Sequence, residues 1–188
     1  MATRTKTIVN GVNTEELFKT IDSIKATPGI AKFKFRITNQ WQDCGHNRST
    51  IKDFYGAFED IDHEQTFVID CDEPAILLGK DKGANPVEHL LNALAGCVTS
   101  GIVYHAAARG IEIQEIESSI DGDIDLHGFL GIDPNVRPGY QGIRMNFKIK
   151  ADNLTDEQIN ELATFSSFSP VFNTVSQGTK VDVKAERM

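Results

Sequence analysis

The sequence predicts an α+β protein in which several antiparallel strands accompany one long central helix. Two observations carry this prediction. Apolar residues recur at three- and four-residue steps between residues 85 and 109, whereas they alternate with polar residues in segments on both sides of that stretch. The strand segments also follow one another in runs, which favours an α+β fold over a doubly wound parallel sheet.

Residues 13–25 are expected to form the first helix. Asn13 or Thr14 can cap it, acidic residues fill its first turn, and its apolar residues share one face. The Pro28-Gly29 pair then ends it. We interpret residues 1–30 as an N-terminal helical extension and residues 31–188 as the main domain.

Three strands are expected before the central helix. Residues 31–37 alternate Phe and Ile with Lys and Arg, which is typical of a half-buried strand. Residues 51–58 and 67–71 give a second and a third strand, and residues 42–49 are interpreted as a polar turn. Pro74 ends the pairing, because proline lacks a backbone N–H donor.

Residues 85–109 predict a long, mostly buried helix. Asn85 is a good N-cap, and Pro86 is favoured at the first helical position. Glu88 occupies the third helical position, where its carboxylate can reach back to the cap. Gly110 is a suitable end.

Strands and helices also follow the central helix. Residues 111–126 predict one long strand with a bulge near Glu115, and residues 142–150 predict another strand after a proline-containing loop. Two further helices are expected, one after Thr155 and one beginning at Ser169-Pro170. Val181 and Val183 are expected to form a short closing strand.

Composition and charge exclude several classes of protein. The chain has 188 residues, of which 40% are hydrophobic and 24% charged, as in folded soluble proteins. The net charge of −8 and the pI near 5.1 argue against nucleic-acid binding and against docking on anionic membranes. The N-terminus carries no secretory signal, and no apolar run approaches the ~20 residues that cross a bilayer. We therefore expect a cytoplasmic protein.

The three cysteines do not form a recognisable framework. Cys44, Cys71 and Cys97 are odd in number and none belongs to a C-x-x-C pair, so neither a disulfide scaffold nor a zinc knuckle is expected. The stretch Cys44-Gly45-His46 has two potential metal ligands but no second cluster, so we expect no metal. No phosphate-binding loop or dinucleotide fingerprint is present, and we expect no cofactor.

Cys97 is the candidate for chemistry. It follows Leu90 by seven residues and so points within about 20° of that leucine, toward the apolar side of the helix. One interpretation is a small buried hydrophobic residue; the other is a reactive thiol. A reactive thiol in mid-helix needs a cation from elsewhere. Arg48 is one candidate, and the other interpretation of Arg48 is a solvated loop arginine, which the sequence alone favours. Glu88 lies on the opposite side, ~13 Å along the helix.

At this point the chain resembles a known family. Residues 67–97, F-V-I-D-C-D-E-P-A-I-L-L-G-K-D-K-G-A-N-P-V-E-H-L-L-N-A-L-A-G-C, look like the signature of the OsmC/Ohr family, which includes osmotically inducible and organic hydroperoxide resistance proteins. Residues 109–150 and 169–175 are similar to an OsmC-like branch of it. The resemblance covers roughly residues 33–184 and places Cys97 where the family has its first cysteine.

The resemblance implies an intertwined homodimer in which curved antiparallel sheets wrap two central helices, with sites at the dimer interface. Active members reduce organic hydroperoxides. Their first cysteine becomes a sulfenic acid, a second cysteine condenses with it to a disulfide, and an external dithiol reduces that disulfide. An arginine and a glutamate keep the first cysteine in position and in its reactive thiolate form.

This sequence departs from the family pattern at the site. Ser169 stands where the second cysteine is expected, and a hydroxyl cannot form a disulfide. Val87 stands where the glutamate is expected, and the arginine corresponds only loosely to Arg48. The candidate site residues are therefore Cys97, Arg48 and Ser169.

Three functions follow as hypotheses. The first is thiol-dependent reduction of organic hydroperoxides in the oxidative stress response, with Cys97 as the peroxidatic thiol and an external dithiol as reductant. The alternative is a non-peroxidase member that binds a small hydrophobic or thiol ligand at the dimer interface. The third is an interaction module that uses the helix at 13–25.

Overall fold

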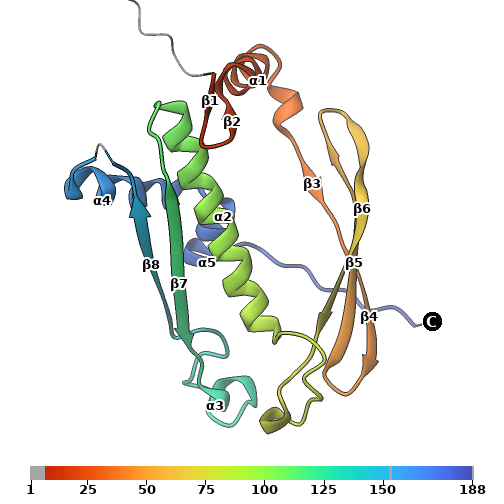
Figure 1. The fold of residues 1–188 in the computed structure, drawn as a ribbon. Coiled ribbons are helices and arrows are strands. Elements are labelled where there is room, and N and C mark those ends of the chain that lie inside the picture. The colour runs from red at the N-terminus through yellow and green to blue at the C-terminus, as the bar shows by residue number, and fades with distance from the viewer. Residues whose placement is uncertain (1–6, 153, 188) are drawn as a thin grey trace, which may run out of the picture. The chain divides into compact units, whose positions relative to one another are not determined.

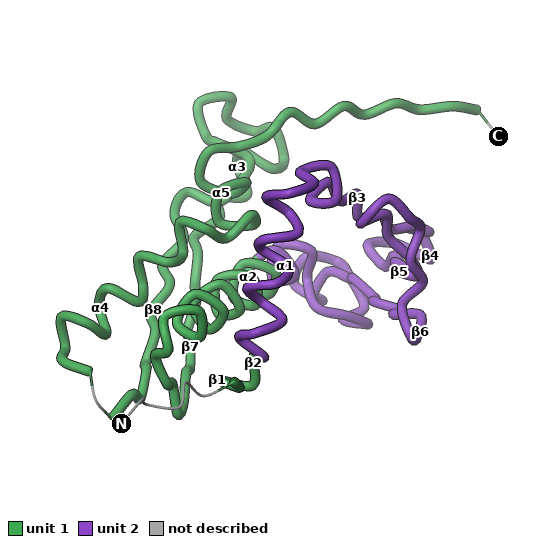
Figure 2. Tube along the Cα trace, turned by 90° about the horizontal axis from the view of Figure 1, so that it is seen from above, with its two compact units in different colours: residues 1–12, 91–188 green, residues 13–90 purple. Residues whose placement is uncertain are grey.

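The computed structural model describes residues 7–152 and 154–187 and has the mixed α+β architecture that the sequence predicts. The chain forms two units, residues 1–12 with 91–188 and residues 13–90 (Figure 2). The long helix α2 (Pro86–Ala108) begins in the second unit and continues through the first.

The core of the unit that contains residues 91–188 is built on one stripe of α2. Leu94, Val98, Ile102 and Ala106 recur at four-residue steps and are buried. Beside this helix runs the antiparallel hairpin of β7 (Glu115–Asp123) and β8 (Gly142–Lys150) (Figure 1). Apolar side chains of both strands pack against the stripe, including Ile120 and its cross-strand partner Met145.

The C-terminal helices complete this core. Helix α4 (Asp156–Thr164) begins with a capping box, a short 3-10 turn η3 (Phe165–Phe168) follows, and α5 (Pro170–Gln177) ends at Gly178. Leu162 and Phe165 are the buried hydrophobic residues of this segment, and both belong to the α2 core cluster. These two side chains therefore hold the C-terminal segment on α2.

An N-terminal hairpin holds the segment that follows α2. Strands β1 (Ile8–Val9) and β2 (Val12–Asn13) are joined by Asn10-Gly11, whose positive φ angles of 54° and 78° fit a tight hairpin turn. The Asn10 amide donates to the Ile111 carbonyl at 2.9 Å, and its oxygen accepts from the Ile113 N–H at 2.8 Å. One side chain thus satisfies two backbone groups of a segment without a strand partner there.

The second unit is a four-stranded antiparallel sheet with helix α1 (Thr14–Ala26). The central strand β5 (His46–Gly56) pairs with β6 (Glu59–Cys71), and also with β3 (Lys34–Phe35) and β4 (Thr38–Asp43). Two single 3-10 turns, η1 (Pro28–Ala31) and η2 (Ala75–Leu77), complete this unit.

An aromatic row crosses the sheet of the second unit. Neighbouring rings in it have centroids 5.2–6.2 Å apart, and its members are Phe33, Phe35, Phe54, His63 and Phe67. Phe35 is 73% exposed, and Phe33 and Phe67 are exposed as well. A cluster of large, solvent-exposed apolar side chains is typical of a surface that binds another molecule.

The prediction of a polar turn at residues 42–49 is wrong. Strand β4 continues to Asp43 and β5 begins at His46, so only Cys44 and Gly45 form the turn. The sequence pattern missed β4 because every residue of this strand is exposed. Without a buried face, a strand shows no alternation of apolar and polar residues.

Two expectations for the C-terminal half are also wrong. Residues 111–126 are not one bulged strand, because β7 spans only Glu115–Asp123 with unbroken register and Asp125 caps a short helix, α3 (Leu126–Phe129). Residues 181–183 are not a strand: they have no strand partner among residues 7–152 and 154–187, and Val181 and Val183 are exposed. Apolar alternation predicts a strand only when another strand supplies the hydrogen bonds.

Candidate functional site

The helix that carries Cys97 starts as its sequence predicts. The Asn85 side-chain oxygen accepts from the Val87 N–H at 2.9 Å, and Glu88 Oε2 accepts from the Asn85 N–H at 2.9 Å. This reciprocal cap fixes the first turn of α2. Glu88 therefore has the capping role predicted for it.

Cys97 lies on the flank of the buried stripe of α2. Its thiol is free and half-buried, and it points about 60° from Leu94 and about 100° from Val98 on a regular helix. The sequence places this direction on the apolar side of the helix, yet Leu90, which shares it, is 38% exposed. In this chain the sulfur therefore borders the core without being enclosed by it.

Ser169 is fixed as a helix cap in the same unit. The residue is only 1% exposed, and its hydroxyl oxygen accepts from the Phe172 N–H at 3.1 Å at the start of α5. The Ser169 carbonyl accepts from the Asn173 N–H at 3.0 Å. The position that the resemblance assigns to a second cysteine therefore has a structural hydroxyl at a helix start.

Arg48 lies on β5, and its guanidinium is engaged by a carboxylate of the same sheet. Arg48 Nε and Nη2 donate to the two Asp70 oxygens at 2.9 and 3.2 Å, and His46 Nε2 lies 2.8 Å from Asp70 Oδ1. The hydrogen bond from Arg48, and then that from His46, holds the pKa of Asp70 below its usual range. The sequence did not indicate Asp70 as a site residue. Arg48 and Asp70 are cross-strand partners only because of the β5–β6 register.

The other two cysteines belong to the unit of residues 13–90 and differ in exposure. Burial, and then the charge of Asp70, raises the pKa of the Cys71 thiol, which lowers its thiolate fraction and its reactivity. Cys44 is exposed at the β4–β5 turn, and its Sγ lies 3.1 Å from the Leu78 carbonyl oxygen.

A buried carboxylate organises the loop between β6 and α2. Asp72 is 1% exposed and accepts three backbone N–H groups, from Glu73 at 2.8 Å and from Lys80 and Lys82 at 3.1 Å each. Burial works to raise the pKa of Asp72, but the three N–H donors together outweigh it and lower that pKa. The loop also needs Gly79, where a Cβ atom would lie 1.8 Å from the Glu73 carbonyl oxygen.

Asp72→Asn is expected to lower Tm by about 5 °C at pH 7, because in either orientation the new amide NH2 group faces at least one of the backbone N–H donors of Glu73, Lys80 and Lys82. Since folding lowers the pKa of Asp72, the stability from its carboxylate is present above the unfolded value near 3.8 and is lost as the pH falls below that value. Thermal unfolding by circular dichroism should therefore show the difference at pH 7 and its decrease below pH 3.8.

The matched control for this prediction is Asp81→Asn, a like change at an exposed position of the same loop. Asp81 has a φ of 55°, which asparagine also tolerates. Equal changes in Tm for the two variants would contradict the assigned role of Asp72.

Neither a metal centre nor a membrane span is established by the described residues. Among residues 7–152 and 154–187, no group of three or more His, Cys, Asp or Glu side chains could hold a metal ion. His46, which the sequence offered as a potential metal ligand, lies instead against the Asp70 carboxylate. Helix α2 is long and apolar enough to cross a bilayer by length and composition alone, a test that the core helix of a soluble protein also passes.

Comparison with known proteins identifies the family. Residues 79–184 match the model of the OsmC family, described as OsmC-like protein, and this stretch contains α2, β7, β8 and the C-terminal helices. No curated protein is similar enough in sequence to count as a match.

Solved structures share the fold at low sequence identity. An OsmC-like protein from Mycoplasma pneumoniae has a TM-score of 0.57 at 20% identity, with 80% of this chain and 94% of that chain covered. The organic hydroperoxide resistance protein OsmC from Legionella pneumophila has a TM-score of 0.51 at 14% identity, with 77% and 91% covered. These likenesses concern the fold, whereas the family match covers more than half of the sequence. The chain therefore belongs to the OsmC-like protein family.

Proposed function

We propose that this protein reduces organic hydroperoxides with Cys97 as the attacking thiol, as part of an oxidative stress response in the cytoplasm. The observation that carries the proposal is a free, half-buried thiol at position 97, on the central helix within the matched family region. The name of the Legionella pneumophila neighbour refers to organic hydroperoxide resistance.

The chemistry starts at the sulfur of Cys97. Its thiolate attacks the terminal peroxide oxygen, the O–O bond breaks, and the alkoxide leaves and takes a proton to become an alcohol. Cys97 is then a sulfenic acid. A first external thiol condenses with it, releasing water and forming a mixed disulfide, and a second thiol, such as the other half of a dithiol, restores Cys97.

The chain's own residues restrict which thiol can reduce the Cys97 sulfenic acid. Ser169 has no sulfur and its oxygen caps α5, which supports resolution by an external dithiol. Cys71 is a poor substitute, because the pKa of its thiol is raised. Arg48 remains the proposed cation that stabilises the Cys97 thiolate, and Asp70 would orient its guanidinium.

The proposal includes a homodimer. Two features of the described residues support it: the exposed aromatic row around Phe35, and the unpaired extended segment with Val181 and Val183. Both are apolar surfaces whose burial against a second copy would be favourable. No membrane or nucleic-acid partner is proposed, in keeping with the acidic net charge.

One observation favours the alternative function. Arg48 already binds both oxygens of Asp70, so part of its charge is neutralised within its own sheet. Without a free cation nearby, the Cys97 thiol would have no group that stabilises its thiolate. Such a thiol fits the alternative function, a non-peroxidase family member that binds a small hydrophobic or thiol ligand at the dimer interface.

Intact-protein mass spectrometry after one equivalent of cumene hydroperoxide tests the proposal. We expect the wild type to gain one oxygen or, with a small thiol present, a mixed disulfide at Cys97, and to consume peroxide catalytically with a dithiol. Cys97→Ser should lose all of this, whereas Cys44→Ser should keep it. Light scattering on the same samples should give twice the chain mass.

Two results would contradict the peroxidase. One is equal peroxide consumption by the wild type and Cys97→Ser. The other is reaction of Cys97 with a thiol probe no faster than free cysteine at neutral pH, which is the result expected of the alternative.

A further inference from the structure

A cavity separate from Cys97 lies within the unit of residues 91–188. It has a volume of about 520 Å³, and its walls come from α2, β8, the loop before β8, α4, η3 and α5. Most of the lining is apolar, with Leu94, Val98, Met145, Phe147, Phe172 and Val175 as its main members. Neither Cys97 nor Ser169 lines it, so the peroxidase proposed above does not account for it.

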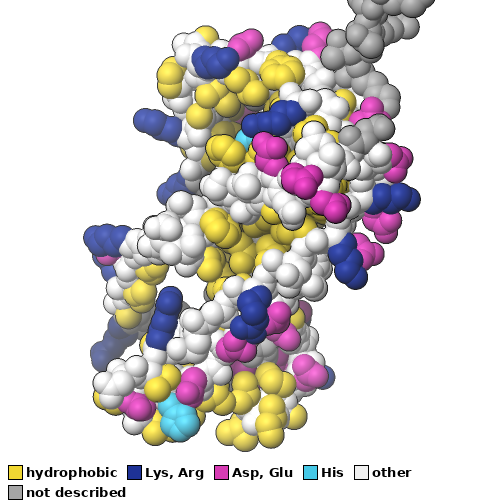
Figure 3. All heavy atoms as spheres, turned by 90° about the vertical axis from the view of Figure 1, so that its left-hand side faces the viewer, with side chains coloured by type: hydrophobic (Ala, Val, Ile, Leu, Met, Phe, Trp, Pro, Cys, Tyr) yellow, Lys and Arg dark blue, Asp and Glu magenta, His cyan; other side chains and the backbone are white. Residues whose placement is uncertain are grey.

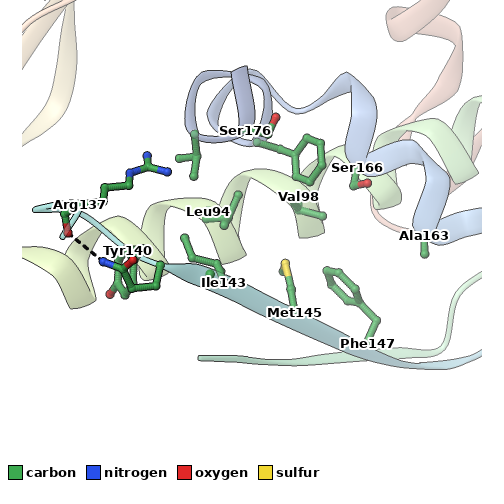
Figure 4. A pocket seen from close by; sticks show the side chains of 14 residues that line it. Leu94, Val98, Arg137, Tyr140, Ile143, Met145, Phe147, Ala163, Ser166 and Ser176 are labelled. Atoms are coloured by element: carbon green, nitrogen blue, oxygen red, sulfur yellow. Dashed lines mark hydrogen bonds between the residues drawn. The ribbon is translucent and has the colours of Figure 1, made fainter. Parts of the chain in front are cut away.

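The charged group of this cavity lies at one end of it. Figure 4 shows Arg137 and Tyr140 at one end, Met145 and Phe147 farther along β8, and Ala163 and Ser166 at the other end. Hydrophobic side chains also gather in the middle of the face in Figure 3, between charged side chains. A mostly apolar cavity of this size with one charged end is typical of a small-molecule site.

Arg137 supplies a positive charge at the polar end that no carboxylate offsets. No Asp or Glu lines the cavity, and the Arg137 guanidinium has no ion pair or hydrogen bond with any residue of 7–152 or 154–187. Its backbone carbonyl accepts from the Gln141 side chain at 2.8 Å, which ties down the loop that carries it. By contrast, Arg144 on β8 pairs with Asp121 and Asp123.

We infer that this cavity binds an apolar monocarboxylate, with the carboxylate on Arg137 and the apolar chain along Met145 and Phe147 toward Ala163. The planar guanidinium matches a carboxylate with two parallel hydrogen bonds, which makes arginine the side chain of choice for this head group. The apolar lining stabilises the tail by removing it from water. The site contains no thiol and binds its ligand without reaction.

Calorimetric titration with decanoate and with decanol tests the head group, because the two probes share a tail length. We expect the wild type to bind decanoate at least about tenfold more tightly than decanol, as charge-assisted hydrogen bonds warrant. Arg137→Gln should remove this preference and leave decanol binding unchanged. Arg144→Gln, the matched control on a paired arginine, should keep the preference.

Two further variants separate this site from the proposed peroxidase. Cys97→Ser should bind decanoate as the wild type does, even though it loses peroxide turnover. Ala163→Phe adds a ring at an exposed position of α4 in the cavity wall and should weaken both probes, with an unchanged unfolding curve as the check on folding.

The inference is overturned if decanoate does not bind the wild type, if the two probes bind alike, or if Arg137→Gln keeps the preference for decanoate. It is also overturned if Ala163→Phe leaves both affinities unchanged, since the ligand would then lie elsewhere. None of these results bears on whether Cys97 consumes peroxide.

Discussion

Phe165→Ala is expected to lower the free energy of unfolding by about 3–5 kcal/mol, because it removes a buried ring and leaves a cavity. Phe165 is 7% exposed and belongs to the core cluster on α2. The Arg109 guanidinium carbon lies 4.4 Å from its ring centroid, and the His105 ring lies 5.3 Å away. The substitution therefore removes packing and a cation–π contact together.

Urea unfolding followed by circular dichroism measures this effect. The matched control is Phe168→Ala in the same 3-10 turn, since Phe168 is 60% exposed and its ring stacks on the His105 ring with centroids 4.4 Å apart. We expect the control to lose less than about 1.5 kcal/mol, the value of an aromatic pair. Similar losses for both variants would mean that η3 does not hold the C-terminal segment on α2.

Ser169→Cys is expected to change the oxidised product of the proposed peroxide reaction from a sulfenic acid to a disulfide. The resemblance assigns the second cysteine to this position, so the variant should form a disulfide between Cys97 and the new thiol after one equivalent of cumene hydroperoxide. Its mass should fall by two hydrogens, whereas the wild type should gain an oxygen. The loss of the hydroxyl cap on α5 should cost about 1 kcal/mol of stability.

Peptide mapping after alkylation identifies the bonded pair. Ser167→Cys is the matched control, two residues away and exposed, and it should form no bond with Cys97. A disulfide requires Cα atoms within about 7 Å of each other. If Ser169→Cys gives the same products as the wild type, position 169 does not face Cys97 in the assembled protein and the correspondence drawn from the resemblance fails.

Local patterns in the sequence predicted the elements whose hydrogen bonds close within a few residues. The start of α2 at Pro86 and the Glu88 cap are as predicted, and so is the helix begun by Thr155. The strand at 142–150 is as predicted too, because one of its faces is buried and its apolar residues alternate. The α+β class and the OsmC-like family follow from these elements and from the motif that ends at Cys97.

The sequence by itself therefore determined the helix caps, the half-buried strand at 142–150 and the position of the thiol on α2, since each depends on residues close together in the chain. The half-buried strand expected at 31–37 is wrong, because β3 contains only Lys34 and Phe35 and both are exposed. Only the tertiary structure decided that Arg48 binds Asp70, that Asn10 holds Ile111 and Ile113, and that Arg137 lies at one end of an apolar cavity. The physical reason is that these contacts join segments 22 to 103 residues apart, or elements packed face to face. Strand register and packing bring such residues together, and periodicity along the chain does not record either of them.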